Sequence, residues 1–190
     1  MVATKHTKLT KAIARKIVEL VDCGLVKGKG VQEPGKMCVE AAVCCALGLP
    51  HSDDPPCVGK SVREFKISLN DSDWSSDMAR AKGLRRLAIA QLGSDALNQT
   101  EFVTNLQRAV IKYVVPAALR SAASCHPDQS HKEALEAEAV KCADEGTESA
   151  AESAWSAAES AAESAAWSAA GADFWKAAAA TLLKLLAKAK

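Results

Sequence analysis

Seven cysteines are the residues of this 190-residue chain with the widest chemical range, and their positions limit what they can do. They stand at positions 23, 38, 44, 45, 57, 125 and 142, so three fall inside one apolar stretch. An odd number with such a cluster argues against a secreted disulfide framework. We expect free thiols that act mainly as small buried apolar groups.

Two catalytic or metal alternatives draw on the same region. A cysteine nucleophile would use Cys38 near a helix start, where the helix dipole lowers a thiol pKa, with His51 as base and Asp53 as its orienting group. A metal ion would use Cys38, Cys45, His51 and Cys57, although the closely spaced ligand pairs that are typical of zinc sites do not occur. His51 and Asp53 could equally serve only to build a proline-rich loop. No metal or cofactor is expected, and these residues stay weak candidates.

A third candidate is an anion site in the glycine-rich segment 28–36, which leads into a helix start with free backbone amides. The segment matches neither the Walker pattern, because Met37 replaces the hydroxyl residue, nor the dinucleotide fingerprint, which needs a preceding strand. A flexible connector is the alternative. The candidate ligand-binding residues are Lys29, Gly30, Gly35, Lys36, His51, Asp53, Asp54, Arg85 and Arg86.

Composition narrows the class of protein. The chain has 24 basic and 23 acidic residues, a net charge of +1, which argues against DNA binding driven by bulk charge. No apolar run is long enough to span a bilayer and the N-terminus lacks a signal peptide, so a cytoplasmic protein is expected. The charge is uneven: residues 1–124 carry +6 and residues 125–190 carry −5. Opposite charges on two parts favour docking within or between subunits.

Apolar residues recur with the helical period throughout, and no stretch alternates as a strand would, so the predicted fold is all-α. Helices are expected over about 8–22, 36–47, 76–92 and 101–123, with a shorter one after Ser61. Pro116 should kink the helix over 101–123. These elements form a compact head over residues 1–124. Residues 125–130 are a linker, and a helical tail follows over residues 131–190, opened by a capping box at Ser130 and Glu133.

The tail is rich in alanine, serine, glutamate and tryptophan. From Thr147 its glutamates recur at a fixed interval of three helical turns, at positions 148 and 159 and again at 152 and 163, which suits a nearly straight helix with alanine on one side. Trp155, Trp167 and Trp175 are predicted to anchor this weakly apolar helix, and residues 173–190 form an amphipathic end rich in lysine. Three roles are open: self-assembly in an oligomer, packing on its own head, and, least favoured, binding to a membrane surface.

The stretch GKMCVEAAVCCALGLPHSDDPPCVG, followed by REFKISLNDSDWSSDMARAKGLRRLAIAQLGS, resembles a group of small uncharacterised proteins of bacteria and their phages. The resemblance covers the part of the head from Gly35 to Gly93. It implies that the head is a recurring module and that the tail is an addition of variable length. No activity is attached to the group.

These observations favour a non-enzymatic binding or assembly protein over an enzyme. Its expected partner is itself, through residues 147–190. It could also hold a small anionic, nucleotide-like ligand, for example as a sequestering protein in a phage or bacterial setting. The alternative is a cysteine-dependent enzyme or metal-binding protein that uses Cys38, His51 and Cys57.

Overall fold

The structure is a computed structural model that describes residues 9–162 and the five residues Ala179, Leu182, Lys184, Leu186 and Ala187. The described residues form helices and no strand, which confirms the all-α prediction. None of the described helices is long and apolar enough to cross a membrane. Trp167, Trp175 and most of the predicted amphipathic end at 173–190 lie outside the described residues.

The chain divides into two compact units within helix α5 (Gln99–Ala109). Unit 1 comprises residues 1–102 with 186–190, and unit 2 comprises residues 103–185. We predicted a boundary between residues 124 and 125. The division therefore assigns the helix before that boundary to the second unit rather than to the predicted head.

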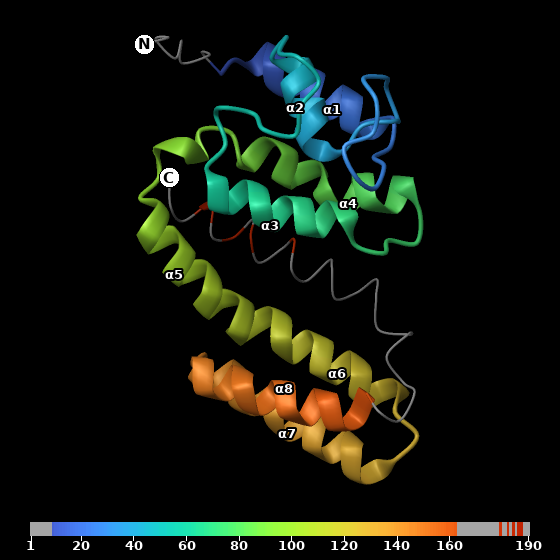
Figure 1. Cartoon of the computed structure of the whole chain (residues 1–190), viewed down its shortest axis with the longest axis vertical. Coiled ribbons are helices and arrows are strands. Elements are labelled where there is room, and N and C mark those ends of the chain that lie inside the picture. The colour runs from blue at the N-terminus through green and yellow to red at the C-terminus, as the bar shows by residue number, and fades with distance from the viewer. Residues whose placement is uncertain (1–8, 163–178, 180–181, 183, 185, 188–190) are drawn as a thin grey trace. The chain divides into compact units, whose positions relative to one another are not determined.

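The described part of unit 1 contains four α-helices and a short 3₁₀ turn (Figure 1): α1 (Lys11–Asp22), α2 (Val39–Ala46), α3 (Lys60–Asp71), α4 (Asp77–Ala90) and Ser94–Ala96. Side-chain oxygens of Thr10 and Ser76 accept backbone N–H groups at the starts of α1 and α4, as expected for N-caps. Helix α1 packs on α2 and α4, and α2 also contacts α3. The buried helix α2 is thus the central element.

Buried polar side chains fix the loops of unit 1. The guanidinium of Arg80 donates to the carbonyl oxygens of Leu25 and Asn70, at 3.0 and 2.6 Å, and so joins the segment after α1 to the end of α3. The ring of Trp74 lies against Gly83 so closely that a Cβ atom at that glycine would collide with it. The Trp74 indole nitrogen donates to the carbonyl of Leu69 at 2.8 Å.

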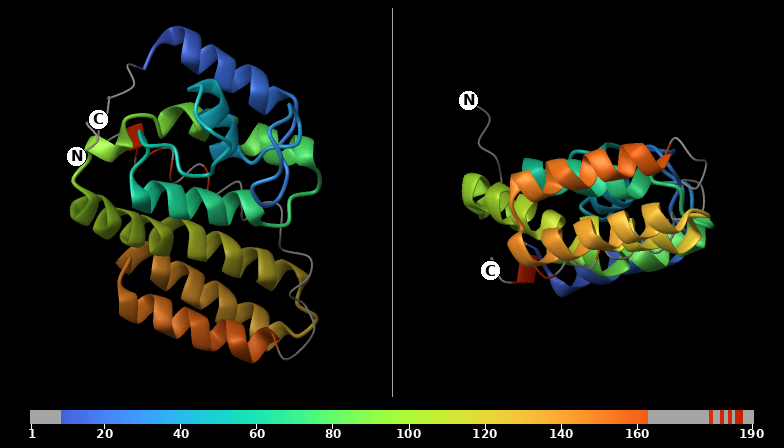
Figure 2. Two further views of the ribbon diagram at one scale, coloured as in Figure 1. Left: turned by 45° about the horizontal axis from the view of Figure 1, so that its top comes forward. Right: turned by 90° about the horizontal axis from the view of Figure 1, so that it is seen from below.

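In unit 2, a π-helical turn (Val110–Val114) leads into α6 (Val115–Cys125), and α7 (Gln129–Glu145) and α8 (Glu148–Ala162) follow. The π turn lies just before Pro116, which has no N–H group to donate to the carbonyl of Lys112. A wider turn accommodates that missing donor. Helices α6, α7 and α8 lie side by side with successive helices antiparallel (Figure 2).

A polar N-cap and a glycine at the C-terminus define the ends of α7. Its N-cap is Asp128, whose carboxylate accepts the backbone N–H groups of Ser130 and His131, so the predicted cap at Ser130 is corrected by two residues. Gly146 ends the helix with a φ of 64°, a left-handed conformation that glycine adopts without strain. The turn at Gly146 reverses the chain, and the tail therefore begins with two helices rather than one rod.

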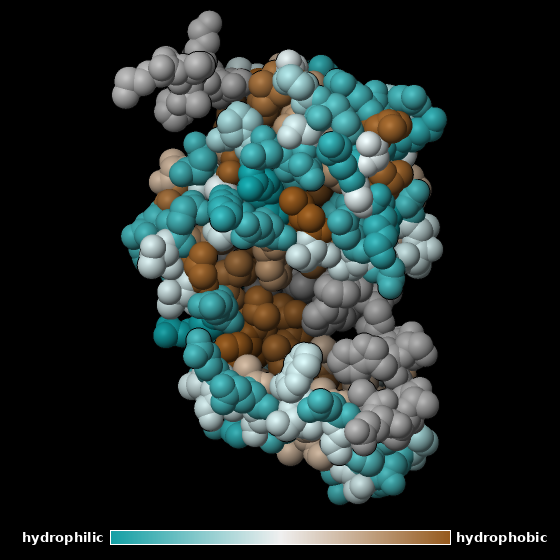
Figure 3. Space-filling view, viewed as in Figure 1, coloured by the Kyte–Doolittle hydropathy of each residue, from teal (hydrophilic) through white to brown (hydrophobic). Residues whose placement is uncertain are grey.

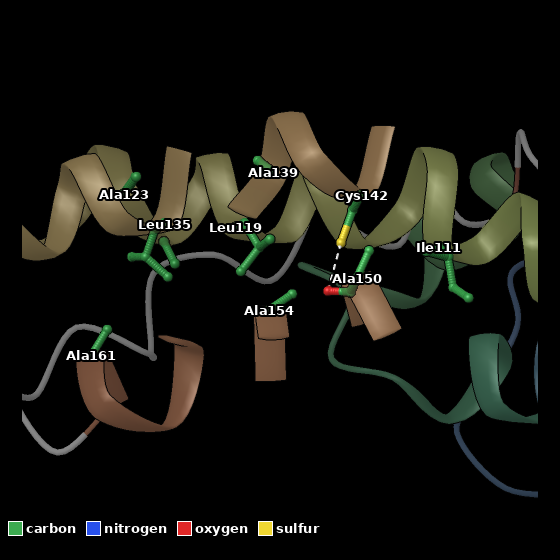
Figure 4. Close-up of a cluster of buried hydrophobic side chains, with 10 residues drawn as sticks. Ile111, Leu119, Ala123, Leu135, Ala139, Cys142, Ala150, Ala154 and Ala161 are labelled. Atoms are coloured by element: carbon green, nitrogen blue, oxygen red, sulfur yellow. Dashed lines mark hydrogen bonds between the residues drawn. The ribbon is translucent and has the colours of Figure 1, made fainter. Parts of the chain in front are cut away.

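Alanine dominates the core of unit 2 (Figure 4). Its buried cluster consists of Ile111, Leu119, Ala122, Ala123, Leu135, Ala139, Cys142, Ala150, Ala154 and Ala161. The thiol of Cys142 donates to the carbonyl of Ala150 at 3.3 Å, which links α7 to α8. Small side chains at these positions allow the helix backbones to approach closely.

Candidate functional site

The glycine-rich loop that suggested an anion site is tied together by its own backbone. Gly30 and Met37 form an isolated antiparallel bridge, and Val31 donates to the carbonyl of Lys36 at 2.8 Å. Gly30 has a φ of 69°, and a Cβ atom there would collide with that same carbonyl oxygen. The glycine is thus explained by a close crossing of the chain, without any ligand.

The start of α2 offers few free amides, because side chains occupy them. The amide of Val39 donates to the side-chain oxygen of Asn70, and the amide of Ala41 donates to the sulfur of the N-cap residue Cys38, each at 3.3 Å. The first turn also holds Glu40, which is fully buried. A carboxylate at this position already uses the positive end of the helix dipole.

A small cavity of about 20 Å³ lies beside this helix start. Its polar lining consists of Lys29, Cys38, Glu40, Asp53, Asn70 and Asp71. The volume suits about one water molecule. Three carboxylates against one ammonium make its surroundings unfavourable for an anion.

The remaining predicted loop ligands are bonded to protein groups. Lys36 forms an exposed ion pair with Glu33 at 2.7 Å, and that hydrogen bond raises the pKa of Lys36. Asp54 pairs with Arg63. Gly35 has a φ of 77° and lies close to the backbone of the segment after α1. Each of these residues therefore has a local structural role.

The predicted basic contacts on α4 are separate from the loop. The guanidinium of Arg85 forms a fork with Asp22 of α1, with N–O distances of 2.6 and 3.0 Å, and this hydrogen bonding lowers the pKa of Asp22. Arg86 is exposed on the same helix. In the described part of the chain, no hydrogen bond or ion pair joins either arginine to residues 28–36. The structure does not bring the predicted anion ligands together into one site.

The candidate nucleophile lacks the features of an activated thiol. Burial raises the pKa of Cys38, and this effect outweighs the two backbone N–H groups near the sulfur that act in the opposite direction. The sequence-based expectation of a lowered thiol pKa is therefore wrong. His51 uses Nε2 to contact the carbonyl of Gly30 at 2.9 Å, and no hydrogen bond joins it to Cys38 among the described residues. Asp53 lines the small cavity instead.

The cysteines are free thiols, as expected. Burial raises the pKa of Cys44 to about 12 and also raises that of Cys57. Cys45 is half-buried near the end of α2. Over the residues that the structure describes, no group of three or more histidine, cysteine, aspartate or glutamate side chains is arranged to hold a metal ion.

The most unusual polar feature is an ion pair that the sequence analysis missed. Lys66 of α3 and Glu40 of α2 are both fully buried, with Nζ and Oε1 2.9 Å apart, and neither has a further hydrogen-bond partner in the described residues. Burial lowers the pKa of Lys66, and the charge of Glu40 opposes that shift. The pair joins α2 to α3, and the cavity of about 20 Å³ that Glu40 lines is too small to admit a substrate. Two signals were available: Glu40 interrupts an apolar helix, and Lys66 falls between Val62 and Leu69 on a buried stripe.

The outer face of α8 carries exposed side chains for which no ion pair is found within the described residues. Trp155 is 73% exposed, so it does not anchor the tail on its own chain, and anchoring on another copy stays a prediction. At about 100° per residue, Glu148, Glu152, Trp155 and Glu159 fall within a strip about 60° wide. We name these four residues the Trp155 stripe. The buried alanines of α8 lie on the opposite side of the helix, which explains why the indole points away from α7.

Large apolar side chains are exposed at several other described positions. Hydrophilic residues cover most of the face of unit 1 seen in Figure 3, with separate hydrophobic positions between them. Large exposed apolar side chains in the described residues are Leu9, Val31, Met78, Tyr113, Val140 and Trp155. No ion pair involves the three glutamates of the Trp155 stripe within the described part of the chain.

No family model, no curated protein and no solved structure matches this chain.

Proposed function

We propose that the protein is a non-enzymatic assembly protein that associates with further copies of itself through residues 147–190. The outer face of α8, with the Trp155 stripe, supplies the described part of this contact. The observation that carries the proposal is the 73% exposure of Trp155 between acidic side chains that have no ion pair in the described residues. Tryptophan is among the residues most enriched at protein interfaces, because it contributes a large apolar area and one hydrogen-bond donor.

The internal packing of unit 2 supports the same role. Helix α8 uses Ala150, Ala154 and Ala161 to pack inside the unit, so its one large apolar side chain in residues 148–161 lies outside that packing. Covering an indole that is exposed to water lowers the free energy of the complex, because apolar surface leaves the water. The fold of the unit and the proposed contact therefore use opposite faces of one helix.

The alternative, a cysteine-dependent enzyme or metal protein, receives no support from the site. Cys38 has a raised pKa, and His51 is engaged with a backbone carbonyl. The small anionic ligand stays a prediction, and it too gains no support, since the amides at the start of α2 have side-chain partners and the adjacent cavity is acidic. Assembly is the function that the surfaces favour.

A single surface substitution tests the proposal in the full-length chain. Trp155→Ser should leave the helical content unchanged, because the side chain is exposed, and should weaken self-association measured by sedimentation velocity. Val140→Ser is the matched control, since Val140 is 50% exposed on α7 but lies outside the stripe. Equal association of the wild type and the Trp155→Ser variant would contradict the proposal.

A further inference from the structure

We propose that the Trp155 stripe of one copy docks into a groove between α1 and α4 in unit 1 of a second copy, so that subunits join head to tail. This inference rests on the proposed self-association and adds the receiving surface. The groove has a volume of about 370 Å³ and is lined by Asp22, Met78, Ala79, Ala81, Lys82 and Arg85.

The size and lining of the groove suit an aromatic side chain. Pockets that bind small molecules have volumes of about 300–1,000 Å³, so the groove can take an indole. Its exposed surface is mainly apolar, and Met78 stands in it with 56% of its surface exposed. A thioether sulfur packs favourably against an aromatic ring. Met78 and Trp155 are thus both incompletely covered and suited to each other.

The charges around the groove complement those of the stripe. Lys82 and Arg86 are exposed on α4 and form no ion pair in the described residues, whereas the charge of Arg85 is matched by Asp22. The stripe carries three glutamates and no basic residue. Opposite charges on two surfaces of the same chain steer copies toward each other and disfavour contact between two identical stripes.

The residue spacing of the two helices matches in an antiparallel arrangement. On α4, Lys82 follows Met78 by four residues and Arg85 follows it by seven. On α8, Glu152 precedes Trp155 by three residues and Glu148 precedes it by seven. At a rise of about 1.5 Å per residue, the charged groups fall within about 1.5 Å of each other along the helix axis. Trp155 then covers Met78 while Glu152 faces Lys82, and Glu148 lies opposite Arg85, whose charge Asp22 already matches.

The proposed contact joins two different surfaces of the chain. The groove and the stripe are different surfaces, so the association is heterologous and produces rings or open chains rather than an isologous dimer. A single helix stripe buries less than the roughly 800 Å² per partner of a stable interface, so the association should be weak and dependent on concentration.

The test uses full-length variants with complementary defects. Trp155→Ser removes the inserting side chain but keeps the groove, and Lys82→Glu reverses the charge at the groove but keeps the stripe. Each alone should weaken self-association, by roughly thirtyfold for the tryptophan and roughly tenfold for the lysine. An equimolar mixture should form a 1:1 heterodimer in sedimentation velocity, because one intact stripe meets one intact groove. Lys60→Glu is the control, since Lys60 is exposed on α3 and gives the same change in charge.

A charge exchange tests the register. The double variant Lys82→Glu with Glu152→Lys should recover association that each single variant loses. If Lys82→Glu and Lys60→Glu associate as the wild type does, the groove is not the receiving surface, and the inference fails while the proposed function stands. The inference also fails if the wild type associates but the mixed variants form no heterodimer. A wild type that stays monomeric overturns the proposed function together with the inference.

Discussion

The cores of the two units differ in the kinds of side chain that they bury. Unit 1 buries charged and polar groups among large apolar side chains, including the Glu40–Lys66 pair and the Arg80 guanidinium. Unit 2 buries mainly alanine, with a few leucine and isoleucine side chains. In unit 1, specific partners fix the position of α2. In unit 2, the close approach of the helix backbones fixes the positions of the helices. The large aromatic side chain of α8 lies outside this core.

This difference bears on function. A buried ion pair is costly to break but gives weak net stabilisation, and it is attested mainly as a device that specifies one arrangement. An alanine-packed hairpin has little apolar area to spare, and the large aromatic side chain of α8 lies outside its core. We therefore assign the proposed self-association to unit 2, which carries the Trp155 stripe.

The largest effect is expected from breaking the buried pair. Glu40→Gln leaves the Lys66 ammonium without a counter-charge in a fully buried position and should reduce the free energy of unfolding by about 3–5 kcal/mol. Urea unfolding followed by circular dichroism measures this change. The double variant Glu40→Leu with Lys66→Met removes both charges and should be much closer to the wild type. A single variant as stable as the wild type would contradict the role given to the pair.

An intermediate effect is expected from enlarging an alanine in unit 2. Ala139 is fully buried on α7, and Ala139→Leu should overpack the core of unit 2 and cost about 1–3 kcal/mol in unfolding free energy. Ala137→Leu is the matched control, because Ala137 is exposed on the same helix. Thermal unfolding of the two variants compares them directly. Equal midpoints would show that close packing of α7 and α8 is not what holds unit 2 together.

The smallest effect concerns the cap of α7. Hydrogen bonds, first of all from the Ser130 hydroxyl, lower the pKa of Asp128 to about 2. The carboxylate therefore stabilises the fold above its ordinary pKa of about 4, and this contribution is lost as the pH falls from about 4 toward 2.

Asp128→Asn keeps a capping side chain that does not titrate. The difference in melting temperature between the wild type and this variant should thus shrink across that pH range. A constant difference would mean that the carboxylate charge does not support the helix start.

Local rules predicted much of this fold. Helical periodicity gave the all-α class. The helix end at Gly146 was not predicted, and the kink expected at Pro116 stays a prediction, although a π-helical turn precedes that residue. The positions of Glu40 and Lys66 on apolar helix faces signalled their burial, but their pairing could not be predicted, because only the approach of α3 to α2 brings them together. The exposure of Trp155 was missed because large aromatic residues are expected to be buried, although the spacing of Ala150, Ala154 and Ala161 already directs the indole outward.

The site predictions assumed that certain residues lie close together in the fold, and the sequence does not show which residues do. Gly30 and Lys36 do meet, but through a backbone bridge rather than around a ligand space. Cys38 does begin a helix, yet burial dominates its pKa. The groove between α1 and α4 combines Asp22 with residues of a helix far along the chain, and no motif marks it.

The most direct test of the central claim is the molar mass of the unmodified full-length chain in solution, measured by light scattering over a range of concentrations. Self-association through unit 2 predicts a mass above the 19.9 kDa of one chain that rises with concentration. It also predicts that Trp155→Ser brings the mass back toward that of the monomer. A mass that stays at the monomer value at every concentration would contradict the account.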